Sequence, residues 1–223
     1  MTTLWQVAEE WELFTDLFDR TVLLNDDNIS EFIPEKGDAV VLWGGPDIDP
    51  KLYLDIALGF TAVQEARDIL DMIVLRKAAD LCIPVFGVCR GMQLIAAYAG
   101  GSLIQHADGH DGDDHSITID AGNNPNWHER MVLTNSLHHQ MVRAYHGEIT
   151  ILAACEPALS HRHLTGPKTY PAACVNREVE AIKIADFGMY GVQFHPEYPD
   201  APASCVAYAK YLFHRMMKES IWK

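Results

Sequence analysis

The stretch Gly87-Val88-Cys89-Arg90-Gly91 decides the fold because of what flanks it. The residues before it, Leu81 to Phe86, are short and apolar, as a buried parallel strand is. The residues after it, Met92 to Ala99, favour a helix that Gly100 and Gly101 would end. A strand, a sharp turn and a helix around G-x-C-x-G predict a nucleophile elbow, in which a strained backbone pushes the cysteine side chain out over the sheet edge.

Cys89 is therefore the candidate nucleophile. The N-terminus of the following helix favours a thiolate at this position. A buried structural thiol is the alternative, and the turn around Cys89 argues against it. The other cysteines lack such a context and are expected in the core: Cys82, Cys155, Cys174 and Cys205. An odd number of cysteines without a C-x-x-C pair fits a disulfide framework poorly.

Composition excludes several classes of protein. The 223 residues suit one α/β domain spanning 1–223, and 48% hydrophobic residues argue against disorder. A net charge of −14, with no basic stripe, argues against nucleic acid and anionic membranes as partners. No apolar run approaches the ~18 residues of a membrane span. The first residues lack the features of a signal peptide, so we expect a cytoplasmic protein.

The rest of the chain alternates between strand and helix patterns. Ala39 to Trp43 reads as an apolar strand, and Thr61 to Leu81 carries apolar residues at helical spacing before the elbow. This order predicts a three-layer α/β sandwich with a mostly parallel central sheet and helices on both faces. Further elements are expected as a helix at 10–20, strands at 22–24, 115–120, 132–134, 150–154, 179–184 and 190–194, and a helix at 203–218.

A second chemical signal lies at the end of the last expected strand. His195 and Glu197 are two residues apart, so on an extended segment both side chains point the same way. Pro196 between them forbids a helix there. Glu197 is thus placed to orient His195 and to stabilise its charged form, as the acid of a catalytic triad does.

Acyl transfer also needs hydrogen-bond donors for the developing oxyanion. Gly44 and Gly45 end a predicted strand, where backbone N–H groups can approach a ligand closely. The backbone N–H of Arg90, which follows the nucleophile, is the other candidate. Both lie at carboxyl ends of predicted parallel strands, where ligands bind in such sheets.

Four motifs together resemble a class I glutamine amidotransferase domain of the peptidase C26 branch, which contains γ-glutamyl hydrolases and γ-glutamyl-GABA hydrolase. They are G-V-C-R-G-M-Q at 87–93, V-Q-F-H-P-E at 192–197, W-G-G at 43–45 and N-S-L-H-H-Q at 135–140. The resemblance covers roughly Val22 to Lys218. Cysteine plus H-P-E at this spacing is its most specific part. The opening residues Thr2 to Ala8 depart from the apolar first strand usual in the family, which puts pocket contacts from that edge in doubt.

The resemblance implies a role for each matching residue. Cys89 would form a γ-glutamyl thioester, His195 would be the general acid and base, and Glu197 would orient it. Gly45 and Arg90 would form the oxyanion hole through their N–H groups. Arg67 and Asp68 would support the elbow or line the pocket. The glutamyl group would be bound by the remaining candidates: Gln93, Ser136, Leu137 and His138.

Two activities stay open from the sequence. One is a free-standing hydrolase of a small-molecule γ-glutamyl amide, and the other is a glutaminase that passes ammonia from glutamine to a separate synthetase or ligase. An idle module that only keeps the fold is a third and weaker alternative. No cofactor is implied. Oligomeric state is left open, with the apolar side of the last helix as a candidate interface.

No metal site is expected from the sequence. The segment 106–115 contains histidines and aspartates, but their spacing matches neither an EF-hand loop nor H-E-x-x-H, so a solvated loop that could cover the pocket is predicted: His106, His110, Asp111, Asp113, Asp114 and His115. His138 is expected in the pocket wall, and His161 to His163 on the surface.

Overall fold

The computed structural model describes residues 1–143, 148–166, 168–171 and 177–220. Its main feature is a nine-stranded sheet, whose strands in spatial order are β2 (Arg20–Leu24), β1 (Thr3–Val7), β3 (Ala39–Leu42), β4 (Val85–Val88), β14 (Met189–Val192), β13 (Glu178–Ile184), β10 (Ile149–Cys155), β7 (His115–Ile119) and β8 (Met131–Thr134). Strands β2 to β14 pair in parallel, and strands from β14 to β8 pair antiparallel.

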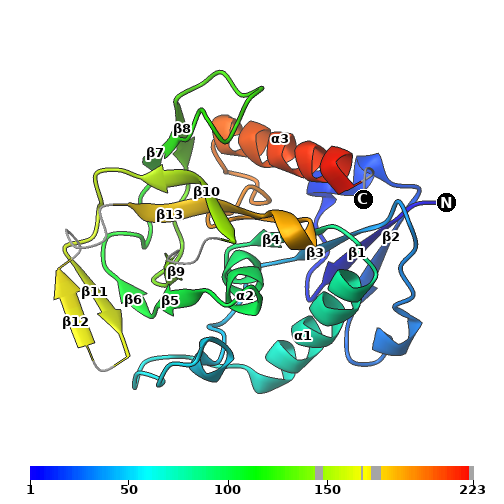
Figure 1. Cartoon of the computed structure of the whole chain (residues 1–223), viewed down its shortest axis with the longest axis horizontal. Helices are drawn as coiled ribbons and strands as arrows, with labels where there is room; N and C mark the ends of the chain where they lie inside the picture. Colours follow the sequence, from blue (N-terminus) through cyan, green and yellow to red (C-terminus); the bar gives the residue numbers. More distant parts are fainter. Residues whose placement is uncertain (144–147, 167, 172–176, 221–223) are drawn as a thin grey trace.

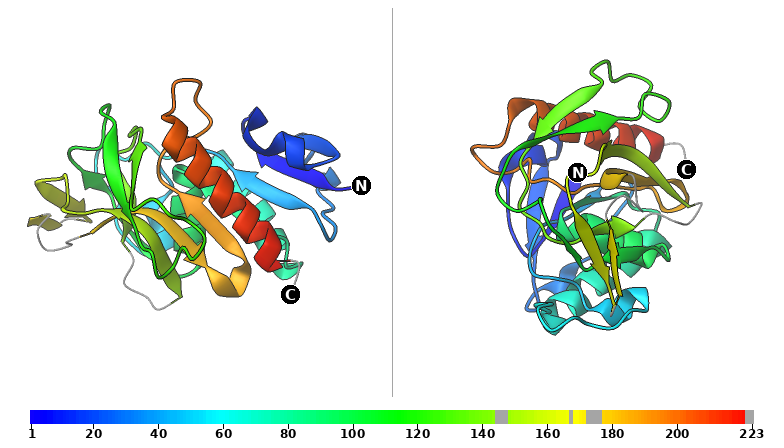
Figure 2. Two further views of the ribbon diagram at one scale, coloured as in Figure 1. Left: turned by 90° about the horizontal axis from the view of Figure 1, so that it is seen from above. Right: turned by 90° about the vertical axis from the view of Figure 1, so that its left-hand side faces the viewer.

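Helices cover both faces of the sheet, as predicted. Helices α1 (Glu65–Asp80) and α2 (Arg90–Tyr98) lie on one face, and α3 (Ala203–Ser220) lies on the other (Figure 1). Strand β3 explains this, since Val40 and Leu42 belong to the core beneath α1 and α2, while Ala39 and Val41 belong to the core beneath α3. Figure 2 shows α3 packed over one face of the sheet.

The N-terminal edge differs from its sequence-based expectation. Thr2 to Ala8 looked like a poor first strand, yet β1 is buried along its whole length and pairs in parallel with both β2 and β3. Its Thr3 N–H and the Trp5 indole are both satisfied by the Asp38 carboxylate, at 2.7 and 2.9 Å. The Asp38 carboxylate thus satisfies two N–H groups that burial of this strand would otherwise leave without a partner.

The segment predicted as a helix at 10–20 is also different. It forms only a short 3-10 helix, Glu12–Leu17, before β2 begins. Phe14 fixes this turn by stacking on Phe213 of α3, with ring centroids 4.1 Å apart. Among the described residues, the other 3-10 helices are Ile29–Glu31, Pro50–Tyr53 and Ala185–Phe187.

Two small sheets extend the molecule away from the termini (Figure 1). One pairs β5 (Ser102–Ile104) with β9 (Met141–Arg143), and the other contains β6 (His106–Ala107), β11 (Arg162–Thr165) and β12 (Lys168–Pro171). Of the cysteines expected in the core, Cys155 and Cys205 are buried, whereas Cys82 is exposed in the turn after α1. Cys174 lies outside the described residues.

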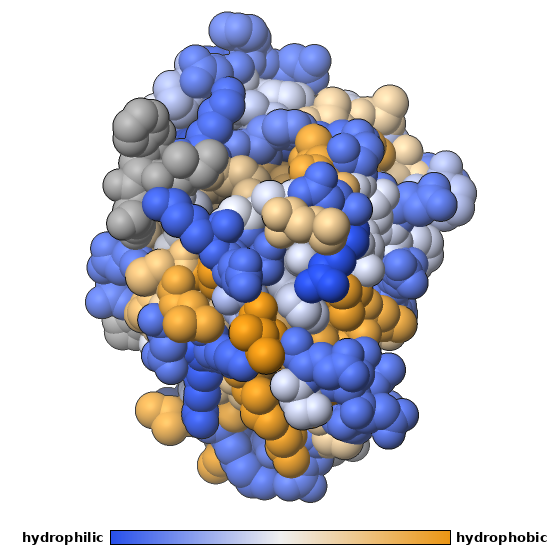
Figure 3. Space-filling model, turned by 90° about the vertical axis from the view of Figure 1, so that its right-hand side faces the viewer, coloured by the Kyte–Doolittle hydropathy of each residue, from blue (hydrophilic) through white to orange (hydrophobic). Residues whose placement is uncertain are grey.

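The end of the molecule that carries the chain termini is mixed in character. Figure 3 shows groups of apolar residues on this face separated by hydrophilic ones. Among the described residues, no helix is long and apolar enough to cross a membrane.

Candidate active site

The elbow has the predicted strand–turn–helix geometry. Cys89 joins β4 to α2 with φ 50° and ψ −108°, a strained conformation for a residue with a side chain. Helix α2 packs directly onto β3, since a Cβ atom on Gly91 would lie 2.0 Å from the carbonyl oxygen of Leu42. The Cys89 N–H donates to the Val192 carbonyl at 2.8 Å, which ties the elbow to β14.

His195 follows β14 and is held on several sides. Its Nδ1 lies 2.7 Å from Oε1 of Glu197. Its backbone N–H donates to the Asn135 side chain, which in turn donates to the His195 carbonyl, both at 2.8 Å. The Tyr198 ring stacks on the imidazole with centroids 4.7 Å apart. Gly44 leaves the space for the ring, because a Cβ atom there would lie 2.7 Å from its Cε1.

The charged form of His195 is favoured. Burial by itself lowers the pKa of this imidazole, but hydrogen bonds to Cys89 and Glu197 outweigh it and raise the pKa to about 10. The Cys89 sulfur also accepts a hydrogen bond from the Gln193 amide at 3.5 Å. The arrangement therefore suits a thiolate beside an imidazolium, the reactive state of a cysteine nucleophile.

A cavity of about 230 Å³ opens beside the cysteine. It brings together many of the residues proposed from the sequence, and its lining consists of Gly45, Pro46, Asp47, Phe60, Ala62, Cys89, Gln93, Leu137, His138, His139 and Gln140. Gly45 has φ +146°, which other residues rarely adopt. Ser136 is not part of this lining, and its hydroxyl donates to the His110 carbonyl at 2.7 Å.

Gln93 bridges the two walls of the cavity from its place one turn into α2. Its amide nitrogen donates to the Gln140 carbonyl at 3.0 Å and to the Gln193 side chain at 3.3 Å. Gln193 also contacts the cysteine sulfur. One chain of hydrogen bonds thus connects the nucleophile to the loop at 135–140.

Buried ion pairs support the elbow from beneath. The Arg90 guanidinium contacts the carboxylates of both Asp68 and Asp71. Arg67 pairs with Asp71 at 2.8 Å and donates to the Trp43 carbonyl at 3.1 Å. We call these four residues, Arg67, Asp68, Asp71 and Arg90, the Arg–Asp cluster. From the sequence, Arg67 and Asp68 were expected either to support the elbow or to line the pocket. Neither lines the cavity, and both belong to the ion pairs beneath the elbow.

The histidine-rich segment is not the solvated loop that the sequence predicted. Asp111, Asp113 and Asp114 are exposed, but His110 and His115 are buried, and so is His163, which was expected on the surface. They meet Glu178 and Glu180 of β13 in the interior. We call this group the His–Glu cluster: His110, His115, His138, His163, Glu178 and Glu180. The period-two pattern of β13 puts both glutamates on one face, which was the overlooked signal.

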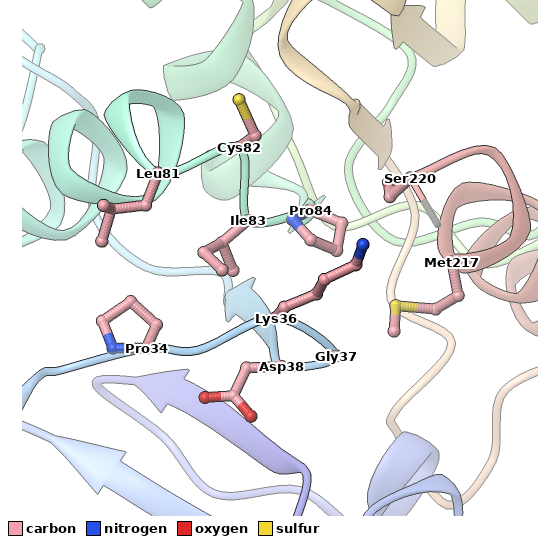
Figure 4. A pocket seen from close by; sticks show the side chains of 10 residues that line it. All are labelled: Pro34, Lys36, Gly37, Asp38, Leu81, Cys82, Ile83, Pro84, Met217 and Ser220. Carbon is pink, nitrogen blue, oxygen red and sulfur yellow. The ribbon is translucent and has the colours of Figure 1, made fainter. Parts of the chain in front are cut away.

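A larger cavity, of about 430 Å³, lies far from this chemistry. It is bounded by residues that precede β3 and β4 and by the end of α3, including Asp38, Ile83 and Met217 (Figure 4). These are the amino ends of the parallel strands, opposite the edge where Cys89 lies. Ligands of parallel sheets bind at carboxyl ends, so we assign the reaction to the smaller cavity.

Three residues that matter to the site were missed from the sequence. Asn135 begins the N-S-L-H-H-Q motif and bonds the His195 backbone. Gln193 directly follows β14, two residues before His195, so on an extended backbone its side chain points to the same side. Asp71 follows Arg67 at i+4, the spacing of a helical ion pair, which could have revealed it.

Comparisons with known proteins bear on the family and the fold of this chain. A glutamine amidotransferase-like protein of Lactococcus lactis subsp. lactis is 27% identical over 205 residues, covering 83% of this chain and 78% of that protein. The Escherichia coli K12 γ-glutamyl-γ-aminobutyrate hydrolase is 33% identical over 81 residues, which are 36% of this chain and 32% of that enzyme. Among solved structures, one described as a GMP synthase subunit from Thermoplasma acidophilum has a TM-score of 0.65 at 20% identity, covering 99% of this chain and 94% of that one.

The family model for peptidase C26 matches residues 21–197. This span includes the elbow, the 135–140 loop and the His195 to Glu197 segment. The α/β sandwich expected from the sequence is confirmed by these likenesses. The chain belongs to the peptidase C26 family.

Proposed function

We propose that the protein is a free-standing cysteine hydrolase that cleaves a γ-glutamyl amide bond through a γ-glutamyl thioester. The observation that carries the proposal is the His195 imidazole, 2.7 Å from Glu197 and hydrogen-bonded to Cys89, at the edge of a cavity. The cavity has room for one glutamyl group, with Gln93, Leu137 and His138 in its wall. Ser136 supports that wall from behind.

The reaction has two steps. The Cys89 thiolate attacks the δ-carbonyl carbon, and N–H groups of Gly45 and Arg90 stabilise the oxyanion. His195 gives its proton to the departing amine as the C–N bond breaks, which leaves the thioester. His195 then takes a proton from water, whose oxygen attacks the thioester, and glutamate and the thiolate are released. Glu197 keeps the proton on Nδ1 throughout and stabilises the imidazolium.

The alternative is a glutaminase that delivers ammonia to a separate synthetase or ligase. The overall likeness to the protein described as a GMP synthase subunit favours it. The nucleophile and the thioester would be the same. The two activities differ in two respects. The hydrolase turns over without a partner and releases a larger amine, whereas the glutaminase needs its partner and releases ammonia.

Glutamate release by the purified chain distinguishes them. The substrates would be glutamine and a panel of γ-glutamyl amides with amines of increasing size, with Cys89→Ala as the blank. We expect strong release from one bulky amide and little from glutamine. Release only after a partner is added would favour the ammonia-delivering glutaminase. Absence of both turnover and labelling by a γ-glutamyl electrophile would contradict both proposals and favour an idle module.

A further inference from the structure

The His–Glu cluster contains groups that hydrogen bonding within the described residues does not explain. His110 precedes β7, His138 precedes β9, and Glu180 lies on β13. All three are buried, and one donor atom from each lies within 4.8 Å of the other two. His110 Nδ1 and His138 Nε2 lie 3.6 and 3.7 Å from Oε1 of Glu180, too far for hydrogen bonds.

The partners of the opposite ring nitrogens fix where the protons are. His138 Nδ1 lies 3.0 Å from the Gln140 carbonyl, which only accepts, so Nδ1 carries the proton. His110 Nε2 lies 2.9 Å from the Glu178 carboxylate and donates to it in the same way. In neutral rings, His110 Nδ1 and His138 Nε2 therefore present bare lone pairs. Neither atom has a hydrogen-bond partner among the described residues, and nor does Oε2 of Glu180.

Oε1 of Glu180 accepts one hydrogen bond, from His115 Nε2 at 3.3 Å, and also faces the two bare ring nitrogens. Three acceptors that face one another in a dry interior repel unless a positive charge lies between them. Glu178 and Glu180 are fully buried, and in the part of the chain that the structure describes their ion pairs are all with histidines. In a tetrahedral metal site with bonds of about 2.1 Å, donor atoms lie roughly 3.4 Å apart. The observed separations of 3.6 and 3.7 Å are close to that value.

We propose that His110 Nδ1, His138 Nε2 and the Glu180 carboxylate bind a divalent transition-metal ion, with zinc as the expected occupant. Two imidazoles and one carboxylate are a donor set that zinc uses in proteins. The outer contacts also fit, since ligating histidines usually donate their second N–H to a carboxylate or a carbonyl. Glu178 and Gln140 supply those acceptors.

The ion would be structural. Its ligands are buried, and His138 also lines the cavity beside Cys89, so the ion would fasten the cavity wall to β13. It takes no part in the proposed hydrolysis. The Cys89→Ala variant should therefore bind the metal as the wild type does, which separates a failure of this proposal from a failure of the proposed function.

Metal content tests the proposal directly. Untagged protein would be dialysed against a chelator, reloaded with zinc, freed of excess metal and measured by elemental mass spectrometry. We expect about one zinc ion per chain in the wild type and less than a tenth of that in His110→Asn and Glu180→Gln. His163→Asn is the matched control, because His163 is an equally buried histidine that contacts Glu178 but not the three donors. It should keep the zinc.

A second measurement covers variants that fail to fold. Cobalt replaces zinc in the wild type, and a visible absorption band of tetrahedral cobalt that zinc abolishes would support the site. If the wild type instead contained about one iron ion per chain, and His110→Asn and Glu180→Gln did not, the site would be supported with iron rather than zinc as its occupant. A wild type without bound metal and without a cobalt band would overturn the proposal. Zinc retained equally in His110→Asn and Glu180→Gln would overturn it as well.

Discussion

The two walls of the cavity rest on buried polar clusters of different chemistry. The Arg–Asp cluster beneath the elbow consists of two arginines that pair with two buried carboxylates. The His–Glu cluster behind the 135–140 loop contains no arginine or lysine, so its two carboxylates depend on histidines or on a bound cation. The carboxylates beneath the elbow are thus paired with arginines, while those behind the opposite wall are paired with histidines and leave room for a bound cation.

Cys89→Ala should have the largest effect and leave both clusters intact. We expect turnover to fall about 10⁴-fold or more, because no other group can form the thioester. The thermal unfolding temperature should change little. Glutamate release and circular dichroism on the same sample measure this. Full activity in the variant would show that the proposed mechanism is wrong.

Arg90→Met removes the centre of the Arg–Asp cluster. Two buried carboxylates, Asp68 and Asp71, would lose their main partner, so we expect the free energy of unfolding to fall by about 3–5 kcal/mol. Urea denaturation measures the change. Arg76→Met, an exposed position on the same helix as the two aspartates, is the control and should stay within about 0.5 kcal/mol of the wild type. If Arg90→Met and Arg76→Met lowered the free energy of unfolding equally, the Arg–Asp cluster would not contribute specifically to stability.

Glu197→Gln tests the carboxylate that bonds directly to a histidine. Turnover should fall roughly 10²-fold, and less than in His195→Ala. Because the pKa of His195 is raised to about 10 from 6.5, its charged form stabilises the fold fully below pH 6.5. That contribution disappears as the pH rises towards 10. The stability difference between wild type and variant should therefore shrink over this window, and the alkaline limb of activity should move to lower pH in the variant.

Ser136→Ala should have the smallest effect, on the side of the His–Glu cluster. It removes one neutral hydrogen bond to the His110 carbonyl, so we expect about 1 kcal/mol less stability. The KM should change less than twofold, since the hydroxyl is already used within the wall. A large rise in KM with unchanged stability would instead mean that Ser136 binds substrate directly.

The sequence was a good guide to the elbow and to most of the central strands, a weaker one to the N-terminal edge around β1, and a poor one to the His–Glu cluster. The elbow, β3 and the His195 segment were predictable because strand, turn and helix signals lie next to one another in the chain. The burial of His110 and His163 was not, since each meets a glutamate of β13 from a distant segment, at separations of 68 and 15 residues. Polar residues near aspartates resemble a solvated loop until their partners are known.

The contact between α2 and β3 has a consequence for the descent of such chains. A side chain on Gly91 would collide with the Leu42 carbonyl whether or not Cys89 reacts. The glycine is therefore required by the fold, and the cysteine only by the chemistry. A descendant that abandoned hydrolysis could replace Cys89 with another residue that tolerates a φ of 50°, such as glycine, but would keep Gly91. Gly91 therefore indicates that a chain has this fold, whereas Cys89 indicates that it can carry out the reaction.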